Sequence, residues 1–226
     1  MTTTHLNLIE KGFVMINNAL PPESCDGVIR AISRIGLNAA GSRNVLVHDW
    51  CGELACALKV HVTLAPLLPP DPVAVQCTLF EKSAAKNWGV GIHQDLSIPV
   101  RERVDAPDCG GWSHKEGVLY TQAPRNVLES LVVVRVHLDP CSPTAGPLRV
   151  VPGSHVWGRL SDAGAEQQRA QRGEVECVAD RGAALVMRPL LLHSSSRVTG
   201  AAVRRVLHFL FGPRCLPYGL RWHQAV

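Results

Sequence analysis

The chain has 226 residues, of which 46% are hydrophobic and 19% charged, with a formal net charge of +4. This composition can supply one sizeable core, and we expect one domain over residues 1–226. Charges are scattered without a run of five or six of one sign, so neither nucleic acid nor a membrane surface is an expected partner. No apolar run approaches the ~20 residues of a membrane span. The N-terminus lacks a signal-peptide pattern, and a cytoplasmic location is expected.

The eight cysteines are spread along the chain and never form a CxxC pair. A zinc ribbon is therefore excluded. In a reducing compartment, most of them should be buried, unpaired and packed as small hydrophobic side chains. The sequence carries no signal for a particular oligomeric state.

The first third of the chain, residues 1–70, reads as helical. Residues 24–35 carry Val28, Ile29, Ile32 and Ile35 at helical spacing, and Gly36 follows as a stop. Residues 50–68 form a second amphipathic stretch, which ends at two prolines.

From residue 71 the pattern changes to short β-branched runs separated by Gly and Pro, which is typical of strands. The expected strands are residues 73–80, 130–138, 147–151, 174–178, 183–192 and 203–211. Helices precede this sheet region instead of alternating with it, which favours a β-sandwich or jelly roll with its core in residues 71–215. Residues 99–125 are poor in strand signals and are expected to form a long loop that acts as a lid or substrate wall.

The strongest local signal for chemistry is the pair His93 and Asp95 in the segment Gly91-Ile92-His93-Gln94-Asp95. In an extended segment, side chains two residues apart point the same way, so both can reach one metal ion. His193 is the best third ligand, because it ends the apolar run 183–192. Two histidines and one carboxylate are the ligand set of non-haem iron(II) oxygenases, which leaves three coordination positions open. By itself, however, an HxD pair is common and often only a surface-loop hydrogen bond.

An arginine pair, Arg204 and Arg205, follows His193 by eleven residues. A strand over residues 203–211 would return antiparallel to the one ending in His193 and would place one arginine near the metal. A guanidinium there could bind a carboxylate through two hydrogen bonds. Strand periodicity does not say which arginine points inward, and a solvated pair at a sheet edge is the ordinary alternative.

Three motifs together resemble the phytanoyl-CoA dioxygenase family over nearly the full length of the chain. They are the HxD segment, the stretch Gly146-Pro147-Leu148-Arg149-Val150-Val151-Pro152-Gly153-Ser154-His155, and His193-Ser194-Ser195 followed by Arg204. The resemblance implies a mainly β fold, a cupin-like double-stranded β-helix with N-terminal helices packed on its larger sheet. It also implies His93, Asp95 and His193 as ligands of Fe(II).

The same resemblance assigns a site for the co-substrate 2-oxoglutarate, with Arg204 as its anchor and Ser195 beside it. Arg135 aligns with a position that faces the co-substrate, although an outward ion pair of Arg135 with Asp139 is the alternative. Gln94, Lys82 and Asn87 complete the expected contacts, and a surface position is the alternative for Lys82. His155 is a rival third ligand, but the family's histidine at this position is not a ligand.

These residues predict a dioxygenase that consumes O2 and 2-oxoglutarate, releases succinate and CO2, and hydroxylates a small organic molecule. Because Asp95 occupies the position that chloride takes in related halogenases, hydroxylation is favoured over halogenation. Two alternatives are a non-catalytic ligand-binding protein of the same fold and a non-redox cupin-like metalloenzyme. The chain is shorter than the fatty-acyl hydroxylases of the family and lacks an evident basic cluster for CoA phosphates, so a CoA thioester is not the expected substrate.

Overall fold

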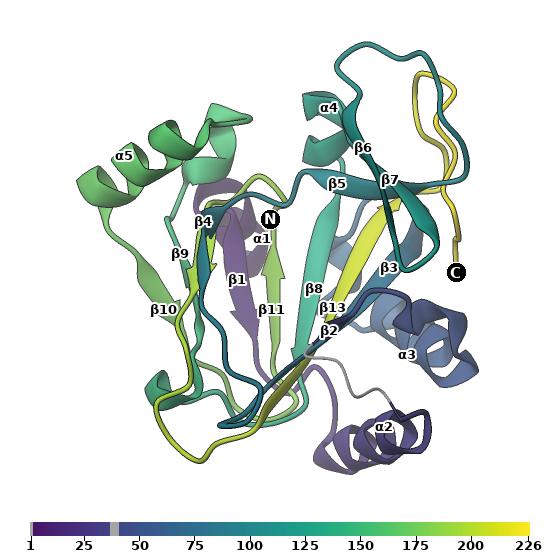
Figure 1. The fold of residues 1–226 in the computed structure, drawn as a ribbon. Coiled ribbons are helices and arrows are strands. Elements are labelled where there is room, and N and C mark those ends of the chain that lie inside the picture. Colours follow the sequence, from purple (N-terminus) through teal and green to yellow (C-terminus); the bar gives the residue numbers. More distant parts are fainter. Residues whose placement is uncertain (1, 37–40) are drawn as a thin grey trace.

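The computed structural model describes residues 2–36 and 41–226, and two facing antiparallel sheets form its centre (Figure 1). The larger sheet has the strand order β1-β11-β8-β13-β3-β2. Its strands are β1 (Phe13–Ile16), β2 (Gly41–Ser42), β3 (Pro72–Lys82), β8 (Val132–His137), β11 (Ala184–Met187) and β13 (Arg204–Pro213). The smaller sheet has the order β10-β9-β12-β4. Its strands are β4 (Val90–His93), β9 (Leu148–Val150), β10 (Val175–Cys177) and β12 (His193–Ser195). This pair of sheets is the expected jelly roll.

Strand β8 shows how the larger sheet serves two cores, because all six of its side chains are buried. Val134 and Val136 pack outward with residues of α2 (Pro22–Arg34) and α3 (Asp49–Val60). Val133 packs on the opposite face, in the second core cluster between the sheets. Arg135 shares that inner face by strand alternation, so the sheet carries its helices outside and its polar site inside.

The helical N-terminal part also contributes a strand. After α1 (Thr3–Glu10), β1 joins the edge of the larger sheet beside β11. The helix expected at 24–35 is α2, and the stretch 50–68 is α3 followed by a single 3₁₀ turn at Ala65–Leu67. Among the described helices, none combines the length and apolarity needed to span a membrane. All eight cysteines are free, and five of them are buried.

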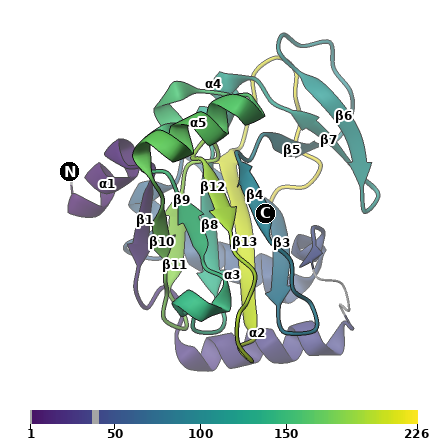
Figure 2. The same ribbon diagram turned by 60° about the vertical axis from the view of Figure 1, so that its left-hand side comes forward.

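The expectation of a long loop over residues 99–125 is wrong. This segment contains most of a third sheet, formed by β5 (Ser97–Val100), β6 (Gly110–Lys115) and β7 (Val118–Gln122) in the order β5-β7-β6. The β6–β7 hairpin turns at Gly117, whose φ is +80°. Figure 2 shows these strands beyond one end of the larger sheet, whereas α5 (Asp162–Arg172) crosses the end of the smaller sheet. The short helix α4 (Arg125–Glu129) leads from the third sheet into β8.

The apolar run 183–192 is not one strand. The chain leaves the larger sheet at the end of β11, turns, and enters the smaller sheet as β12. Strand β13 correspondingly pairs with β3 and β8, not with the strand that carries His193. The expected antiparallel return of this strand beside the one that carries His193 is therefore wrong, and Arg204 reaches the site from the opposite sheet.

Candidate metal centre

Two neighbouring strands of the smaller sheet bring the predicted ligands together. Strands β4 and β12 are antiparallel with His93 directly opposite His193, and the two imidazole centroids are 4.2 Å apart. Asp95 follows β4, where its backbone N–H donates to the carbonyl of Pro189 at 2.9 Å. One ligand atom from each of the three side chains lies within 4.8 Å of the others. The structure thus assembles the predicted triad.

The two histidines present their Nε2 atoms to the same point. Nδ1 of His93 lies 2.9 Å from the carbonyl of Gly91, and Nδ1 of His193 lies 2.8 Å from the carbonyl of Leu191. A carbonyl can only accept, so it fixes the proton on Nδ1 and leaves the Nε2 lone pair for a metal. Burial lowers the pKa of His193 to about 4, which keeps this ligand neutral near pH 7.

Asp95 has the properties of a carboxylate that can bind a cation. Burial alone would raise its pKa, but His193, His208 and His93 hold it well below the ordinary value. Its Oδ2 atom lies 3.7 Å from Nε2 of His193 and 3.5 Å from Nε2 of His208. That oxygen is buried and has no hydrogen-bond partner among the described residues. A buried, unpartnered carboxylate oxygen facing two imidazole nitrogens fits a divalent metal ion.

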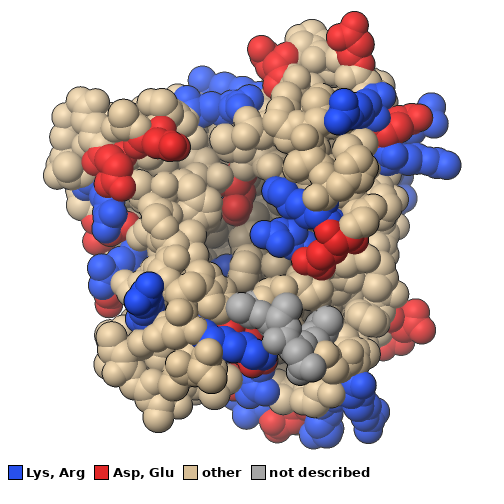
Figure 3. All heavy atoms as spheres, in the orientation of Figure 1, with Lys and Arg blue, Asp and Glu red and all other residues tan. Residues whose placement is uncertain are grey.

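The triad lines a cavity of about 420 Å³ between the sheets. Figure 3 looks into this hollow and shows basic side chains beside its opening. The cavity is lined by residues of both large sheets and of the β6–β7 hairpin. Its polar lining includes Arg43, Gln76, Thr78, Lys82, His93, Gln94, Asp95, Ser97, Lys115, Tyr120, Arg135, His193, Ser194, Ser195, Arg204 and His208.

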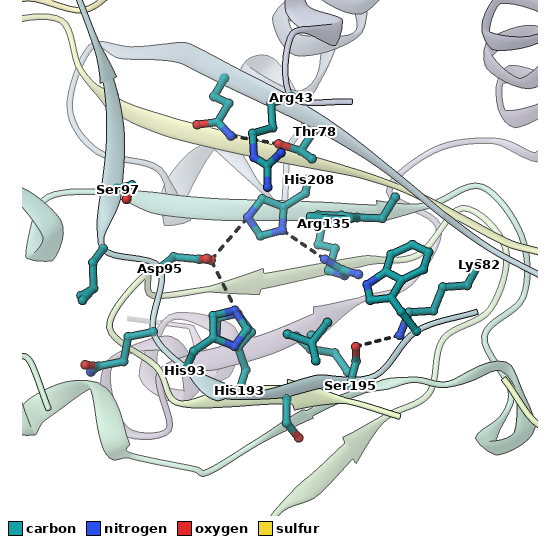
Figure 4. Close-up of a pocket in the computed structure, with 18 of the residues that line it drawn as sticks. Arg43, Thr78, Lys82, His93, Asp95, Ser97, Arg135, His193, Ser195 and His208 are labelled. Carbon is teal, nitrogen blue, oxygen red and sulfur yellow. Dashed lines mark hydrogen bonds and ion pairs between the residues drawn. The ribbon is translucent and has the colours of Figure 1, made fainter. Parts of the chain in front are cut away.

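One end of the cavity holds a pair of buried basic side chains that have no carboxylate partner among the described residues. Arg204 and Lys82 lie opposite each other on β13 and β3, and each is 1% exposed. Arg204 donates to the carbonyl of Gly146 at 2.6 Å. Lys82 donates to Ser195 Oγ at 2.9 Å, as Figure 4 shows. Burial, Arg204 and Arg135 lower the pKa of Lys82 to about 7. Such a cluster can bind a carboxylate of a ligand, and Ser195 lies beside it as expected.

Arg135 points into the cavity, and the outward alternative is wrong. Its Nη1 atom donates to Nδ1 of His208 at 3.1 Å, and its guanidinium lies 5.2 Å from the ring centre of Phe80. Burial and Arg204 lower its pKa to about 9. Asp139, the alternative partner, binds the outward Arg205 at 2.7 Å instead. His208 is one of the lining residues that the sequence did not predict, although it shares the inward face of β13 with Arg204.

Two other expected contacts have structural roles in the described chain. Asn87 does not line the cavity, and its amide bridges the backbone N–H and C=O of Val198. Gln94 does line it, but its amide donates to Gly158 and Leu190 and accepts from the Leu160 N–H.

His155 belongs to a separate cavity and is not a member of the triad. Its Nε2 atom lies 3.0 Å from the carbonyl of Ile9, so the ring contacts the N-terminal helix.

A two-histidine, one-carboxylate centre between the sheets of a jelly roll defines a class of non-haem metalloproteins. The family model described as Phytanoyl-CoA dioxygenase (PhyH) matches residues 8–206. The chain therefore belongs to the phytanoyl-CoA dioxygenase family. None of the curated proteins matches it at the level of sequence.

Solved structures with the same fold share little sequence identity with this chain. HygX from Streptomyces hygroscopicus, with nickel and 2-oxoglutarate bound, is 18% identical with a TM-score of 0.65 over 96% of this chain and 89% of its own. The epimerase SnoN from nogalamycin biosynthesis, in complex with Fe3+, alpha ketoglutarate and nogalamycin RO, is 14% identical with a TM-score of 0.69 over 96% and 86%. The carbocyclase SnoK of the same biosynthesis is 14% identical with a TM-score of 0.71 over 94% of this chain and 84% of its own.

Proposed function

We propose that the protein is an Fe(II)- and 2-oxoglutarate-dependent oxygenase that hydroxylates a small organic molecule. The observation that carries the proposal is one cavity with two matched binding features. A His-Asp-His triad lies in it, and at its end lie a buried arginine and lysine that have no carboxylate partner in the part of the chain that the structure describes. Family membership and the ligands in the HygX and SnoN structures support the same assignment.

Different side chains would bind the metal and the co-substrate. His93, Asp95 and His193 would hold the iron on one face and leave its other positions free. Arg204 and Lys82 would bind the distal carboxylate of 2-oxoglutarate, with Ser195 held by Lys82. Bound iron supplies O2 activation coupled to decarboxylation of 2-oxoglutarate, which yields succinate and CO2. The cavity walls exclude bulk water and orient the substrate.

The test combines a binding signal with product analysis. Under anaerobic conditions, Fe(II) and 2-oxoglutarate together should produce a metal-to-ligand charge-transfer band. Aerobic incubation with a panel of small organic molecules should then release succinate and add one oxygen atom to the product. Absence of both signals would overturn the proposal. A product of unchanged mass would replace hydroxylation by an epimerase-type outcome, and a loss of two hydrogens would indicate ring closure or desaturation.

The carboxylate of Asp95 supports hydroxylation over halogenation. It brings a negative charge to the coordination position that a halide would need, so chloride should not compete there. We expect the wild-type product mass to be the same with and without chloride. Asp95→Gly should lose most hydroxylation, because two imidazoles alone hold the metal less firmly. A chlorinated product from the wild type would reject the hydroxylase assignment and leave the metal site standing.

A further inference from the structure

The cavity has a second polar wall away from Arg204. On β3, Thr78 and Gln76 lie four and six residues before Lys82, which places them ~13 and ~20 Å from it along the strand. His208 is directly opposite Thr78, so the Asp95 end of the cavity is level with this part of β3. The wall formed by Arg43, Gln76, Thr78, Ser97, Lys115 and Tyr120 is therefore available to a substrate beyond the co-substrate end.

Two cations stand on this substrate wall. Arg43 follows β2, whose Ser42 pairs with Leu79, so Arg43 is level with Thr78. In Figure 4 its guanidinium points into the pocket on the side of Thr78 and His208. Lys115 ends β6, and its Nζ atom lies 5.2 Å from the ring centre of Tyr120. Arg43 and Lys115 line the same cavity, and burial together with the charge of Arg43 lowers the pKa of Lys115.

The one carboxylate at the rim does not satisfy both cations. Glu116 accepts hydrogen bonds from the Ser42 hydroxyl at 3.1 Å and the Arg43 backbone N–H at 2.8 Å. Its other oxygen lies 3.7 Å from Arg43 Nη1, which is an ion pair without a direct hydrogen bond between side chains that are 47% and 35% exposed. No carboxylate of the described residues lies within ion-pair distance of Lys115. Glu116 thus links the chain around Arg43 to the β6–β7 hairpin. A solvent-exposed ion pair of this length is weak, so Arg43, which lines the cavity with Lys115, can still bind an anionic ligand.

The net charge of the whole cavity also favours an anionic substrate. Arg43, Lys82, Lys115, Arg135 and Arg204 line it, against the carboxylates of Asp95 and of Glu116 at its rim. Bound Fe(II) and a 2-oxoglutarate dianion cancel each other. The loaded cavity therefore keeps a net positive charge of three, or of two when Lys82 is neutral. Close cations in a partly desolvated cavity repel each other and favour an anionic ligand.

We propose that the substrate carries a carboxylate or phosphate group, which Arg43 and Lys115 bind at the mouth of the cavity. This inference rests on the proposed function, because the inner cations are assigned to 2-oxoglutarate. An anion at the mouth would leave the uncharged part of the substrate directed past Thr78 toward the triad. Arg43 and Lys115 would thereby decide both which molecules enter and which end reaches the metal.

The test measures anion selectivity directly in protein loaded with Ni(II) and saturating 2-oxoglutarate. The probes are matched pairs that differ in charge: 3-phenylpropanoate with 3-phenylpropanamide, cyclohexanecarboxylate with its carboxamide, and phenyl phosphate with benzyl alcohol. Calorimetric titration gives the affinity of each. The anion of at least one pair should bind about tenfold or more tightly than its neutral counterpart, since a charge-assisted hydrogen bond contributes roughly that factor.

Two double variants locate the effect. Arg43→Gln with Lys115→Gln should abolish the anion preference, and Arg43→Lys with Lys115→Arg should retain most of it. Lys11→Gln with Arg101→Gln removes the same charge from exposed positions outside the cavity and should change nothing. Anions and amides binding alike, no anion binding, or a preference that survives the first double variant would each overturn the inference.

Failure of the proposed function would look different. When the same proteins are loaded with Fe(II) in place of Ni(II), the anaerobic Fe(II)–2-oxoglutarate band and aerobic succinate release report on the oxygenase assignment without any probe. Loss of those signals with intact anion selectivity would reject the assignment alone. Intact signals without anion selectivity would reject only the anionic substrate.

Discussion

Each of the two triad histidines has an imidazole whose Nδ1 atom is already engaged by the carbonyl of the residue two positions before it. Only Nε2 remains for a metal, so removing either ring should remove one bond to it. We expect His93→Ala or His193→Ala to weaken Fe(II) or Co(II) binding by about 100-fold or more, with the fold retained because the sheets form without the ion. Calorimetric metal titration and thermal unfolding measure the two effects.

His155→Ala is the matched control for the triad. This histidine lines a different cavity and binds the carbonyl of Ile9. Its loss should lower the melting temperature slightly and leave metal affinity within about twofold. Equal loss of metal in all three variants would contradict the ligand assignment.

The two arginines of the pair should behave oppositely toward the co-substrate. Arg204 is 1% exposed and faces the cavity, whereas Arg205 binds Asp139 outside it. Leaving a buried carboxylate without its cation costs about 3–5 kcal/mol, which is on the order of hundreds-fold in affinity. Arg204→Ala should weaken 2-oxoglutarate binding by that factor, and Arg205→Ala should not. Titration of the charge-transfer band in the anaerobic Fe(II) protein checks the ranking.

The charge of Arg204 can be separated from its shape. Arg204→Lys keeps a cation but loses the planar fork that binds a carboxylate through two bonds. We expect an affinity between those of the wild type and Arg204→Ala. A stronger effect of Arg205→Ala than of Arg204→Ala would mean that the co-substrate lies on the other face of β13.

At the scale of elements, the sequence predicted strands well where β-branched residues are continuous and poorly where tertiary contacts decide. Strands β3, β8 and β13 are long, apolar and central, and their expected ranges overlap the observed ones. Strand β1 has only four residues and is stabilised by its pairing with β11, which no local pattern reveals. The run 183–192 looked continuous because β11 is buried and the leucines that follow it, Leu190, Leu191 and Leu192, are buried as well.

The β6–β7 hairpin was missed for a related reason. Strand β6 carries Gly, Ser, His and Lys and has no buried side chain, so its composition resembles a loop, and the more buried β7 has only five residues. The triad and Arg204 could be predicted because their spacing follows a family pattern. His208 and Arg43 could not, since they reach the cavity through the pairing of β13 and β2 with β3.

Two turn glycines provide a test of packing at this scale. Gly182, before β11, and Gly117, in the β6–β7 turn, have φ angles of +79° and +80°. A Cβ at Gly182 would lie 2.1 Å from the carbonyl oxygen of Leu20, whereas one at Gly117 would meet nothing within 4 Å. Both Ala variants should incur about 1 kcal/mol of left-handed strain. Gly182→Ala should lose roughly 2 kcal/mol more, because backbone must move. Urea unfolding measures the difference, and equal losses would contradict it.

For the whole molecule, the polar interior makes stability depend on pH. His137 lies on the inner face of β8, is 1% exposed, and has two ring nitrogens without a hydrogen-bond partner among the described residues. Burial, with Arg135 and Arg204, lowers its pKa to about 3 from 6.5. Between these values the unfolded chain binds a proton that the folded chain does not. Folding stability should therefore fall as the pH drops from about 6.5 toward 3.

Replacing this histidine by an apolar side chain of similar size should remove its share of the acid sensitivity. Each pH unit in the window corresponds to about 1.4 kcal/mol, so at pH 5 the wild type should lose roughly 2 kcal/mol relative to His137→Leu. At pH 7 the variant should be as stable as the wild type or slightly more so, because no buried nitrogen is left unpaired.

Urea unfolding of metal-free protein at pH 7, 6 and 5 gives both curves, and the exposed His223→Leu serves as the control that should follow the wild type. If the free energy of unfolding depended on pH in the same way for the wild type and His137→Leu, the pKa of His137 would be the same in the folded and unfolded chains. Burial and the charges of Arg135 and Arg204 would then not lower it.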